Sequence, residues 1–331
     1  MGTIINDFIV DAEPVSSAKV SKKKGVDLSS ASIRQVMSGL EEAGYLMHPH
    51  TSAGRVPTEK AYRYYINSLL QMKGLSKGLR ASIEEKISWK KGINDSLMAS
   101  SKLLSVLSHQ AGIVMKPRVS NIIFKHIRFV PIGSKRLIAI MVSQTGVVIN
   151  KTFEIEEDLK TGELEKINNY LNTLLEGLSI DKVKEKIFRE MKEEKALYNK
   201  LLSKALKFGK EMMKDQGAAG FYMEGATNFL NQPEFADIES MKRIFSAFEE
   251  KSILLKLLDE SIRAEGLNIY IGDEIGIKEM EGMSLITYPY GAEGRPLGCI
   301  GVIGPTRMDY SMVIPIVEYT GDTINRIIRE A

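Results

Sequence analysis

The sequence predicts an α+β protein, in which an N-terminal winged helix-turn-helix precedes an antiparallel sheet domain that a helix-rich segment interrupts. Within residues 28–58, an amphipathic helical pattern is followed by two short strand patterns around a polar loop that contains glycine. Strand patterns also occur in residues 122–153 and again beyond residue 252, with glycines at the turns. Residues 154–215 between them are rich in Lys and Glu and poor in β-branched residues, which favours helices.

Length and composition indicate a soluble protein of two or three domains. The chain has 331 residues, and its contents of 44% hydrophobic and 26% charged residues are typical of globular proteins. No apolar run is long enough to span a membrane, and the N-terminus lacks the pattern of a secretory signal. Because Cys299 is the only cysteine, we expect no internal disulfide, no cysteine-based zinc site and a cytoplasmic location. The net charge of +3 is compatible with nucleic-acid binding but does not argue for it.

The first 25 residues predict two short helices. Residues 3–12 carry apolar side chains at helical spacing. Ser16 or Ser17 can cap a second helix that ends at Gly25. The last turn of this helix is a run of three lysines, which either complements the helix dipole or contacts phosphate: Lys22, Lys23 and Lys24.

The third helix is the candidate for reading DNA. It is predicted to begin after Ser29 and to bury four apolar residues spaced i, i+3, i+4 and i+7, namely Ile33, Val36, Met37 and Leu40. The opposite face carries hydrogen-bond donors and no carboxylate before Glu41. An arginine there can bind guanine O6 and N7, and a glutamine can bind adenine N6 and N7. This face suits a helix that enters the major groove, although the helix alone also fits the polar face of any three-helix bundle.

The segment after this helix favours the DNA-binding interpretation. Residues 45–47 and 55–56 predict two short strands, and the loop between them is rich in donors and turn residues. His48 and His50 have no third metal ligand nearby, so contact with phosphate or solvent is the better interpretation. Thr58 is then expected to cap a helix whose tyrosines share the apolar stripe and belong to the core.

The rest of the chain predicts a sheet with a helical insertion. A helix at 94–110 precedes strands at 122–130, 136–143 and 147–153, which we interpret as the opening of an antiparallel sheet. The sheet resumes in three later strands, at 267–271, 284–288 and 297–303. In the last helix, Asp309 is the expected cap and Pro315 should kink the helix or delay its start. Arg307 and Asp309 are expected to form an ion pair at the corner before that helix.

No motif in the chain indicates catalysis. Gly298, Gly301 and Gly304 lack the spacing of a dinucleotide-binding loop, and a buried strand that ends in a turn explains them. The chain also has no Walker lysine, no nucleophile elbow and no cluster of metal ligands. We therefore expect a protein that is not an enzyme and that holds no cofactor and no metal.

Four separated motifs resemble the bacterial heat-inducible transcription repressor family, HrcA. Residues 14–65 resemble its winged-helix domain in the stretches PVSS, LSSASIRQVMSGLEEAGYL and PHTSAGRVPTEKAYRYY. The likeness continues in YMEGATNFLNQPEF (222–235), SLITYPYGAEG (284–294) and GVIGPTRMDY (301–310), and so covers the whole chain. Family members usually have Pro where this chain has Ser30 and Asn where it has Gln35. The base contact of Gln35 is therefore left open.

The resemblance implies a division into four parts. These are a winged-helix DNA-binding domain at 1–72, a linker at 73–96, a GAF-like domain formed by 97–154 and 236–331, and an inserted dimerisation domain at 155–235. It also implies a homodimer that represses chaperone operons from the inverted-repeat operator CIRCE, is released on heat stress and is modulated by the GroEL chaperonin. One winged helix reads few base pairs, which independently favours a dimer on an inverted repeat. The alternative hypothesis is a regulator that senses a small ligand in the GAF-like domain.

These expectations assign roles to thirteen residues. Two are expected to read bases, Arg34 and Gln35, and two to read bases or to position the helix on phosphate, Ser30 and Ser32. Four are expected to hold the wing against the DNA backbone or minor groove: His50, Thr51, Ser52 and Arg55. Five are expected to contact phosphate: Ser16, Ser17, Lys22, Lys23 and Lys24.

Overall fold

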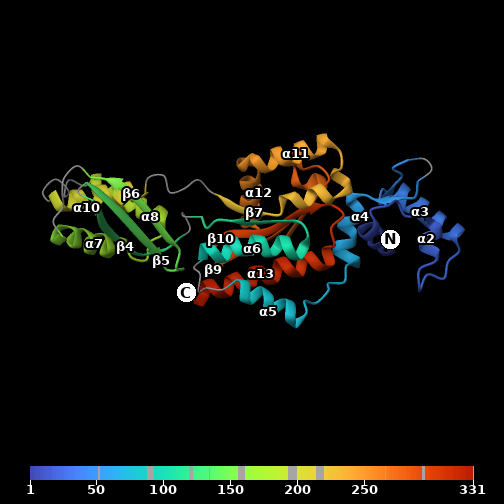
Figure 1. Ribbon diagram of the computed structural model, residues 1–331, viewed down its shortest axis with the longest axis horizontal. Helices are drawn as coiled ribbons and strands as arrows, with labels where there is room; N and C mark the ends of the chain where they lie inside the picture. The colour runs from blue at the N-terminus through green and yellow to red at the C-terminus, as the bar shows by residue number, and fades with distance from the viewer. Residues whose placement is uncertain are drawn as a thin grey trace.

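The computed structural model shows three bodies arranged along one axis (Figure 1). It describes residues 1–50, 53–87, 93–118, 122–133, 135–155, 161–192, 200–213, 220–264, 266–292 and 295–330. We call residues 1–69 the N-terminal body, and residues 77–118 with 220–330 the central body. Residues 122–213 form the inserted body at the opposite end from the N-terminal body (Figure 1). The mixture of helices with antiparallel sheets confirms the predicted α+β class.

The N-terminal body consists of helices and a two-stranded hairpin. Its elements are α1 (Gly2–Asp11), α2 (Ser17–Ser21), α3 (Ser30–Glu42), β1 (Leu46–Met47), β2 (Val56–Pro57), α4 (Glu59–Tyr64) and the π-helical turn η1 (Tyr65–Leu69). Strands β1 and β2 pair antiparallel. A small core of its own holds these elements together, formed by Ile4, Val15, Val20, Ile33, Met37 and Leu46.

Side-chain caps start the helices of this body where the sequence predicts. The hydroxyls of Ser16, Ser29 and Thr58 accept hydrogen bonds from backbone N–H groups three residues later, at 3.2, 3.1 and 3.3 Å. Two details differ from the prediction. Helix α2 ends at Ser21, so the three lysines follow the helix rather than form its last turn. Val36 is 54% exposed, because the buried face of α3 is centred on Ile33 and Met37 and Val36 lies at its flank.

The central body is a five-stranded sheet with helices on both faces. Its strands are β3 (Ala111–Met115), β7 (Phe221–Glu224), β8 (Asn268–Ile271), β9 (Met283–Ala292) and β10 (Arg295–Pro305), in the order β7-β3-β10-β9-β8 with antiparallel pairing. Its helices are α5 (Lys77–Lys86), α6 (Ile93–Ser108), α11 (Ile238–Glu249), α12 (Lys251–Arg263) and α13 (Tyr310–Glu330). Short 3₁₀ turns connect them: η4 (Ala226–Asn231), η5 (Pro233–Phe235), η6 (Gly272–Ile275) and η7 (Lys278–Met280).

Alternate residues of the central sheet face different helices. Helices α6 and α13 cover one face of the sheet, and α11 and α12 cover the other (Figure 1). On β10, Ile300 and Val302 pack in the cluster that includes α6 and α13, whereas Cys299 and Ile303 pack in the cluster that includes α11 and α12. Both faces of the sheet are therefore buried.

The inserted body has a sheet of its own. Strands β4 (Phe124–Gly133), β5 (Arg136–Ser143) and β6 (Val148–Glu154) pair in that order, and they pack with helices α7 (Thr161–Leu175), α8 (Ile180–Lys192) and α10 (Lys200–Met213). Helix α7 also protects the free edge of β4. Its Asn172 and Asn168 side chains accept hydrogen bonds from the N–H groups of Ile127 and Phe129, at 2.8 and 2.9 Å.

The sheets are grouped differently from the sequence prediction. The strands predicted at 122–153 exist, but they pair only with one another and do not open the central sheet. Residues 221–235, expected in the inserted domain, lie in the central body, because β7 pairs with β3 and Phe229 and Phe235 pack beneath α11. A strand pattern shows that a strand forms but not which sheet it joins, and this caused the error.

The last helix begins where its cap predicts. The Asp309 carboxylate accepts a hydrogen bond from the N–H of Ser311 at 3.1 Å. Pro315 lies inside α13 and lacks an N–H, so the Ser311 carbonyl has no helical partner and instead accepts the N–H of Lys73 at 3.2 Å. The predicted ion pair between Arg307 and Asp309 is wrong, because Arg307 pairs with Glu234 and Asp309 pairs with Lys73.

Replacing Gly112 by alanine is expected to destabilise the protein by about 1–3 kcal/mol through overpacking. A Cβ atom at Gly112 would lie 2.1 Å from the carbonyl oxygen of Ser101, because β3 runs close against α6. Gly78 in α5 is the matched control, since a Cβ there meets open space, and Gly78→Ala should be neutral or stabilising. Urea denaturation measures both variants. Equal free energies of unfolding for the two would contradict the close approach of β3 to α6.

Candidate nucleic-acid interface

Helix α3 presents an exposed polar face without acidic residues in its first turn. Ile33 and Met37 are buried, and successive helical residues are rotated by about 100°. Ala31 and Gln35 therefore lie close to the line furthest from the core, with Arg34 on one flank and Glu42 near the same line at the end of the helix. Sequence reasoning named Gln35 and Arg34 but missed Ala31. The helical period measured from Ile33 and Met37 alone would have found it.

Two of the predicted DNA-contacting serines bind each other. The hydroxyl oxygens of Ser17 and Ser30 lie 3.0 Å apart, and Ser17 is 8% exposed. This contact joins the start of α2 to the start of α3 and fixes the angle between the two helices. Ser32 is exposed, and its hydroxyl lies 2.9 Å from that of Ser29. The Ser30 hydroxyl thus has a structural partner.

Acidic side chains neutralise some of the basic residues near α2 and leave others unpaired. Lys19 binds Asp11, and this hydrogen bond raises the pKa of Lys19. The Lys23 ammonium lies 2.6 Å from a carboxylate oxygen of Asp7, whose side chain is 9% exposed. Within the described ranges, Lys22, Lys24 and Arg34 have no ion pair and are exposed. These three cations are the ones available to an external anion.

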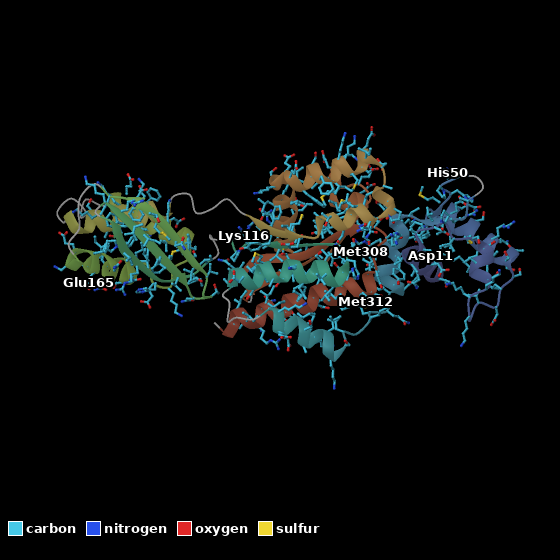
Figure 2. The ribbon with its side chains drawn as sticks, viewed as in Figure 1. Asp11, His50, Lys116, Glu165, Met308 and Met312 are labelled. Atoms are coloured by element: carbon cyan, nitrogen blue, oxygen red, sulfur yellow. The ribbon has the colours of Figure 1, made fainter. Side chains whose placement is uncertain are left out.

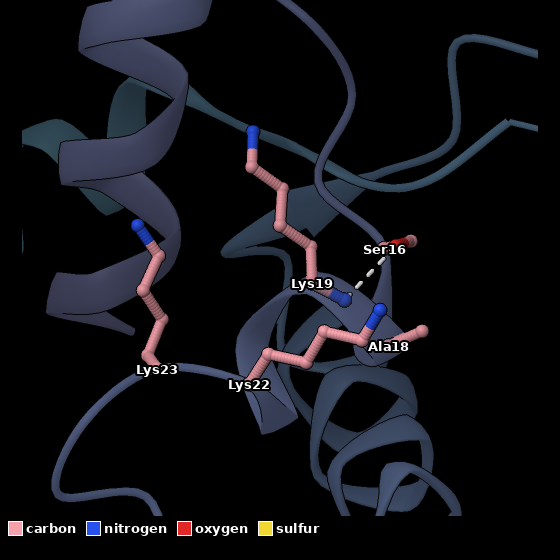
Figure 3. Close-up of a pocket in the computed structure, with 5 residues that line it drawn as sticks. All are labelled: Ser16, Ala18, Lys19, Lys22 and Lys23. Carbon is pink, nitrogen blue, oxygen red and sulfur yellow. Dashed lines mark hydrogen bonds between the residues drawn. The ribbon is translucent and has the colours of Figure 1, made fainter.

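A hollow of about 450 Å³ lies beside α2, lined by Ser16, Ala18, Lys19, Lys22 and Lys23 (Figure 3). Figure 3 shows Lys19 extending from α2, and Lys22 and Lys23 extending from the turn that follows it. The Ser16 hydroxyl oxygen caps α2 by accepting the Lys19 N–H. Lys19 and Lys23 are paired with acids, so Lys22 is the lysine of this hollow that is available to an external anion.

The hairpin is attached to the rest of the N-terminal body by Arg55. Its Nε donates a hydrogen bond of 2.8 Å to the Glu41 carboxylate of α3, its Nη2 forms an ion pair with the same oxygen at 2.8 Å, and the Arg55 side chain is 15% exposed. Its backbone forms two hydrogen bonds of 2.9 Å with Val15. A Cβ on Gly54 would lie 2.5 Å from the Val15 carbonyl oxygen, so this close approach requires glycine. Arg55 thus positions the hairpin.

The loop of the hairpin is described only in part. His50 is exposed at its base (Figure 2). Thr51 and Ser52, which we expect to contact DNA, lie outside the described residues. His48 lies with its Nε2 atom 3.8 Å from Glu41. Elsewhere in the described part of the chain, no three His, Cys, Asp or Glu side chains come together as metal ligands would.

Comparison with known proteins identifies the family. The family model described as HrcA protein C terminal domain matches residues 94–314. The chain is 47% identical over 326 residues to the heat-inducible transcription repressor HrcA of Geobacter sulfurreducens, covering 98% of this chain and 95% of that one. It is 41% identical over 330 residues to the same repressor of Syntrophobacter fumaroxidans, with 99% and 95% covered. The chain belongs to the HrcA family.

A solved structure supports the fold of this HrcA family member. A crystal structure described as a hypothetical protein superposes with a TM-score of 0.68 at 22% identity, and the match covers 99% of this chain and 96% of that one. At this identity the likeness concerns the fold alone. The family resemblance predicted from the four motifs is confirmed by the relatives above. None of the helices in the described ranges is long and apolar enough to cross a membrane.

Replacing Lys23 by alanine is expected to lower the stability of this HrcA protein by about 1–3 kcal/mol, because it leaves a buried carboxylate without its cation. The carboxylate concerned is that of Asp7. Lys22→Ala, one residue away and exposed, is the matched control and should change stability by less than about 0.5 kcal/mol. Adding Asp7→Asn to Lys23→Ala should recover most of the loss. Equal urea midpoints for Lys23→Ala and Lys22→Ala would show that Lys23 has no structural role.

Proposed function

We propose that this chain is a DNA-binding transcriptional repressor of heat-shock chaperone operons, released on heat stress, with the N-terminal body as a winged helix-turn-helix. The observation that carries the proposal is helix α3. It presents Arg34 and Gln35 on an exposed face, has no acid in its first turn and is followed directly by the β1–β2 hairpin. Relatives that align with nearly the whole chain are named heat-inducible transcription repressors.

The contacts of the N-terminal body divide the predicted DNA-binding residues into two groups. In our proposal, Arg34, Gln35 and Ser32 face the bases, together with the outermost residue Ala31. Lys22, Lys24, Ser16 and His50, with Thr51 and Ser52, face the DNA backbone or minor groove. The other four act by positioning these residues, because each binds a side chain that belongs to a different helix of the body: Ser17, Ser30, Lys23 and Arg55. The exposed face of α3 therefore remains the proposed reading surface, and nine of the thirteen predicted residues remain as direct DNA contacts.

The three bodies suggest a revised division into domains. We propose a winged-helix domain at 1–72 and a linker that joins it to a GAF-like domain made of the central body. The inserted dimerisation domain then spans the inserted body, residues 122–213, rather than 155–235. In support of this division, strands β4, β5 and β6 of the inserted body form a separate sheet, and none of them pairs with a strand of the central sheet among the described residues.

The outer face of the inserted sheet fits a contact between two copies of the chain. On β5, Leu137, Ala139 and Met141 are buried against the helices, so alternate residues point to the opposite face. That face carries apolar residues on all three strands: Val130, Ile138, Ile140, Val142 and Val148. Val148 is 48% exposed. A homodimer that buries this face would place two reading helices on one inverted repeat.

Family membership suggests the partners of such a dimer. We propose that the operator is the CIRCE inverted repeat, that the GroEL chaperonin modulates the repressor, and that both meet it in the cytoplasm. The alternative of a small-ligand sensor has no observation in its favour among the described residues. Both faces of the central sheet are filled by side chains from its own helices.

Replacing Arg34 by alanine should weaken binding to the specific operator by roughly 10- to 100-fold, or about 1–3 kcal/mol, and leave binding to random duplex unchanged. The reason is that Arg34 is exposed and without an ion pair among the described residues, so its guanidinium is free to bind a base. Gel-shift titrations on operator and random DNA measure both affinities.

Lys24→Ala is the matched comparison for a phosphate contact. It should weaken binding to both duplexes alike and flatten the salt dependence by about one unit. If Arg34→Ala lost the same affinity for operator and random duplex, a contact between Arg34 and the bases would be contradicted. The absence of any preference of the unaltered protein for the operator would contradict the proposed function itself.

A further inference from the structure

Two helices of the N-terminal body, and the segment that follows this body, bind to one end of the central body. In α1, the carbonyl oxygen of Ile9 accepts a hydrogen bond from Arg307, at the corner between β10 and α13. In α4, Arg63 and Glu59 bind residues of β8 and η6. In the segment after η1, Lys73 binds the start of α13 through its backbone N–H and its ammonium.

Arg307 is the most enclosed of these contacts. Its side chain is 12% exposed, and Glu234 and Gln232 of the central body also bind its guanidinium, the latter at 3.1 Å. Ile9 lies in the last turn of α1, where carbonyls lack helical partners. A cation at this end of a helix also complements the helix dipole. Arg307 therefore joins the C-terminal end of α1 to the central body.

The contacts of α4 form a second attachment. Arg63 donates to the Glu274 carboxylate and to the Ile269 carbonyl, the latter at 2.6 Å. The Glu59 carboxylate accepts the Asp273 N–H at 3.0 Å. Burial opposes ionisation of Glu274, but hydrogen bonds from Arg63 and the Ile271 N–H hold its pKa below the usual value. The charged form of Glu274, which Arg63 binds, is thereby favoured.

Apolar residues fill the space between the attachments. Ile5 of α1 and Tyr62 of α4 are buried in the same cluster as Met308 and Tyr310 of the central body. The rings of Tyr62 and Tyr310 lie 6.0 Å apart. Figure 2 shows Met308 and Asp11 on the two sides of this junction. The core of the central body thus continues into the N-terminal body.

We propose that Arg307, Arg63 and Glu59 are positioning residues that set the orientation of the reading helix on the central body. Either polar attachment alone would leave the N-terminal body free to turn, but two from different helices, with packed apolar residues between them, hold it. In a dimer, this fixed orientation determines the distance and angle between the two reading helices. These residues thereby determine which spacing between operator half-sites the repressor accepts. The inference rests on the proposed function.

Spacing is a sensitive measure of this orientation. Each added base pair moves one half-site by about 3.4 Å along the DNA and rotates it by about 34°. A reading head held only by the chain would follow such changes, because the seven residues 70–76 can span roughly 20 Å when extended. A head held by both helices and by the apolar packing between them cannot. Loss of an attachment should therefore broaden the range of accepted spacings.

The test measures the affinity of the full-length protein for duplexes whose two half-sites are one or two base pairs closer or further apart than in the operator. A duplex with one half-site reports the reading helix alone. For the unaltered protein, each base pair added to or removed from the spacing should weaken binding by about tenfold, comparable to one mismatched base pair. In Arg307→Ala, the loss of affinity per base pair of spacing should fall to less than about threefold, and the affinity for the single half-site should stay within about twofold. Arg307→Lys, which keeps the charge, should restore part of the discrimination.

Arg243→Ala is the matched control, because Arg243 also pairs with an acid of the central body, Glu281, at 3.4 Å, but lies outside this junction. It should bind like the unaltered protein. If circular dichroism shows that Arg307→Ala does not fold, the more exposed Arg63→Gln takes its place with the same expected result. An unchanged spacing profile in the folded variant overturns the inference, as does an unaltered protein that binds the repeat without spacing preference. An unaltered protein that does not bind the repeat at all overturns the proposed function instead.

Discussion

Strand β10 is the part of the molecule on which the other parts depend. Its central residues are buried on both faces, and it pairs with β9 along its length and with β3 on its other side. Gly301 allows this pairing, since a Cβ there would lie 2.4 Å from the Ile286 carbonyl oxygen. The inserted body leaves the sheet between β3 and β7, next to β10. The N-terminal body is attached at the other end, where β10 turns into α13.

This arrangement places the two proposed activities at opposite ends of a rigid core. The apolar outer face of the inserted sheet, which we propose as the contact between two copies, is distant from helix α3 (Figure 1). In a repressor that reads two half-sites, the contact between the copies must fix the relative orientation of their two α3 helices. The continuous apolar core and the Arg307, Arg63 and Lys73 contacts connect the inserted body to the N-terminal body for this purpose.

Local features of the fold were predictable from the sequence, and long-range partners were not. Caps, helices and individual strands follow from the residues next to them, as Ser29 and Thr58 illustrate. The grouping of β4–β6 depends on pairing between segments, which a strand pattern does not contain. The roles of Lys23, Arg55 and Ser17 depend on partners that lie 13 or more residues away in the chain, which the neighbouring residues do not indicate. Val36 fits the helical spacing of the apolar residues but lies at the flank of the buried face, so its side chain is exposed.

Footprinting of the full-length protein on chaperone promoters from its own organism tests the central claim most directly. The account predicts protection of one inverted repeat, with both half-sites covered together at the same protein concentration. Arg34→Ala should lose this protection, and addition of the chaperonin should change the fraction of active repressor without moving the protected region. Absence of protection at any inverted repeat, or protection of a single half-site with no effect of the other, would contradict the account.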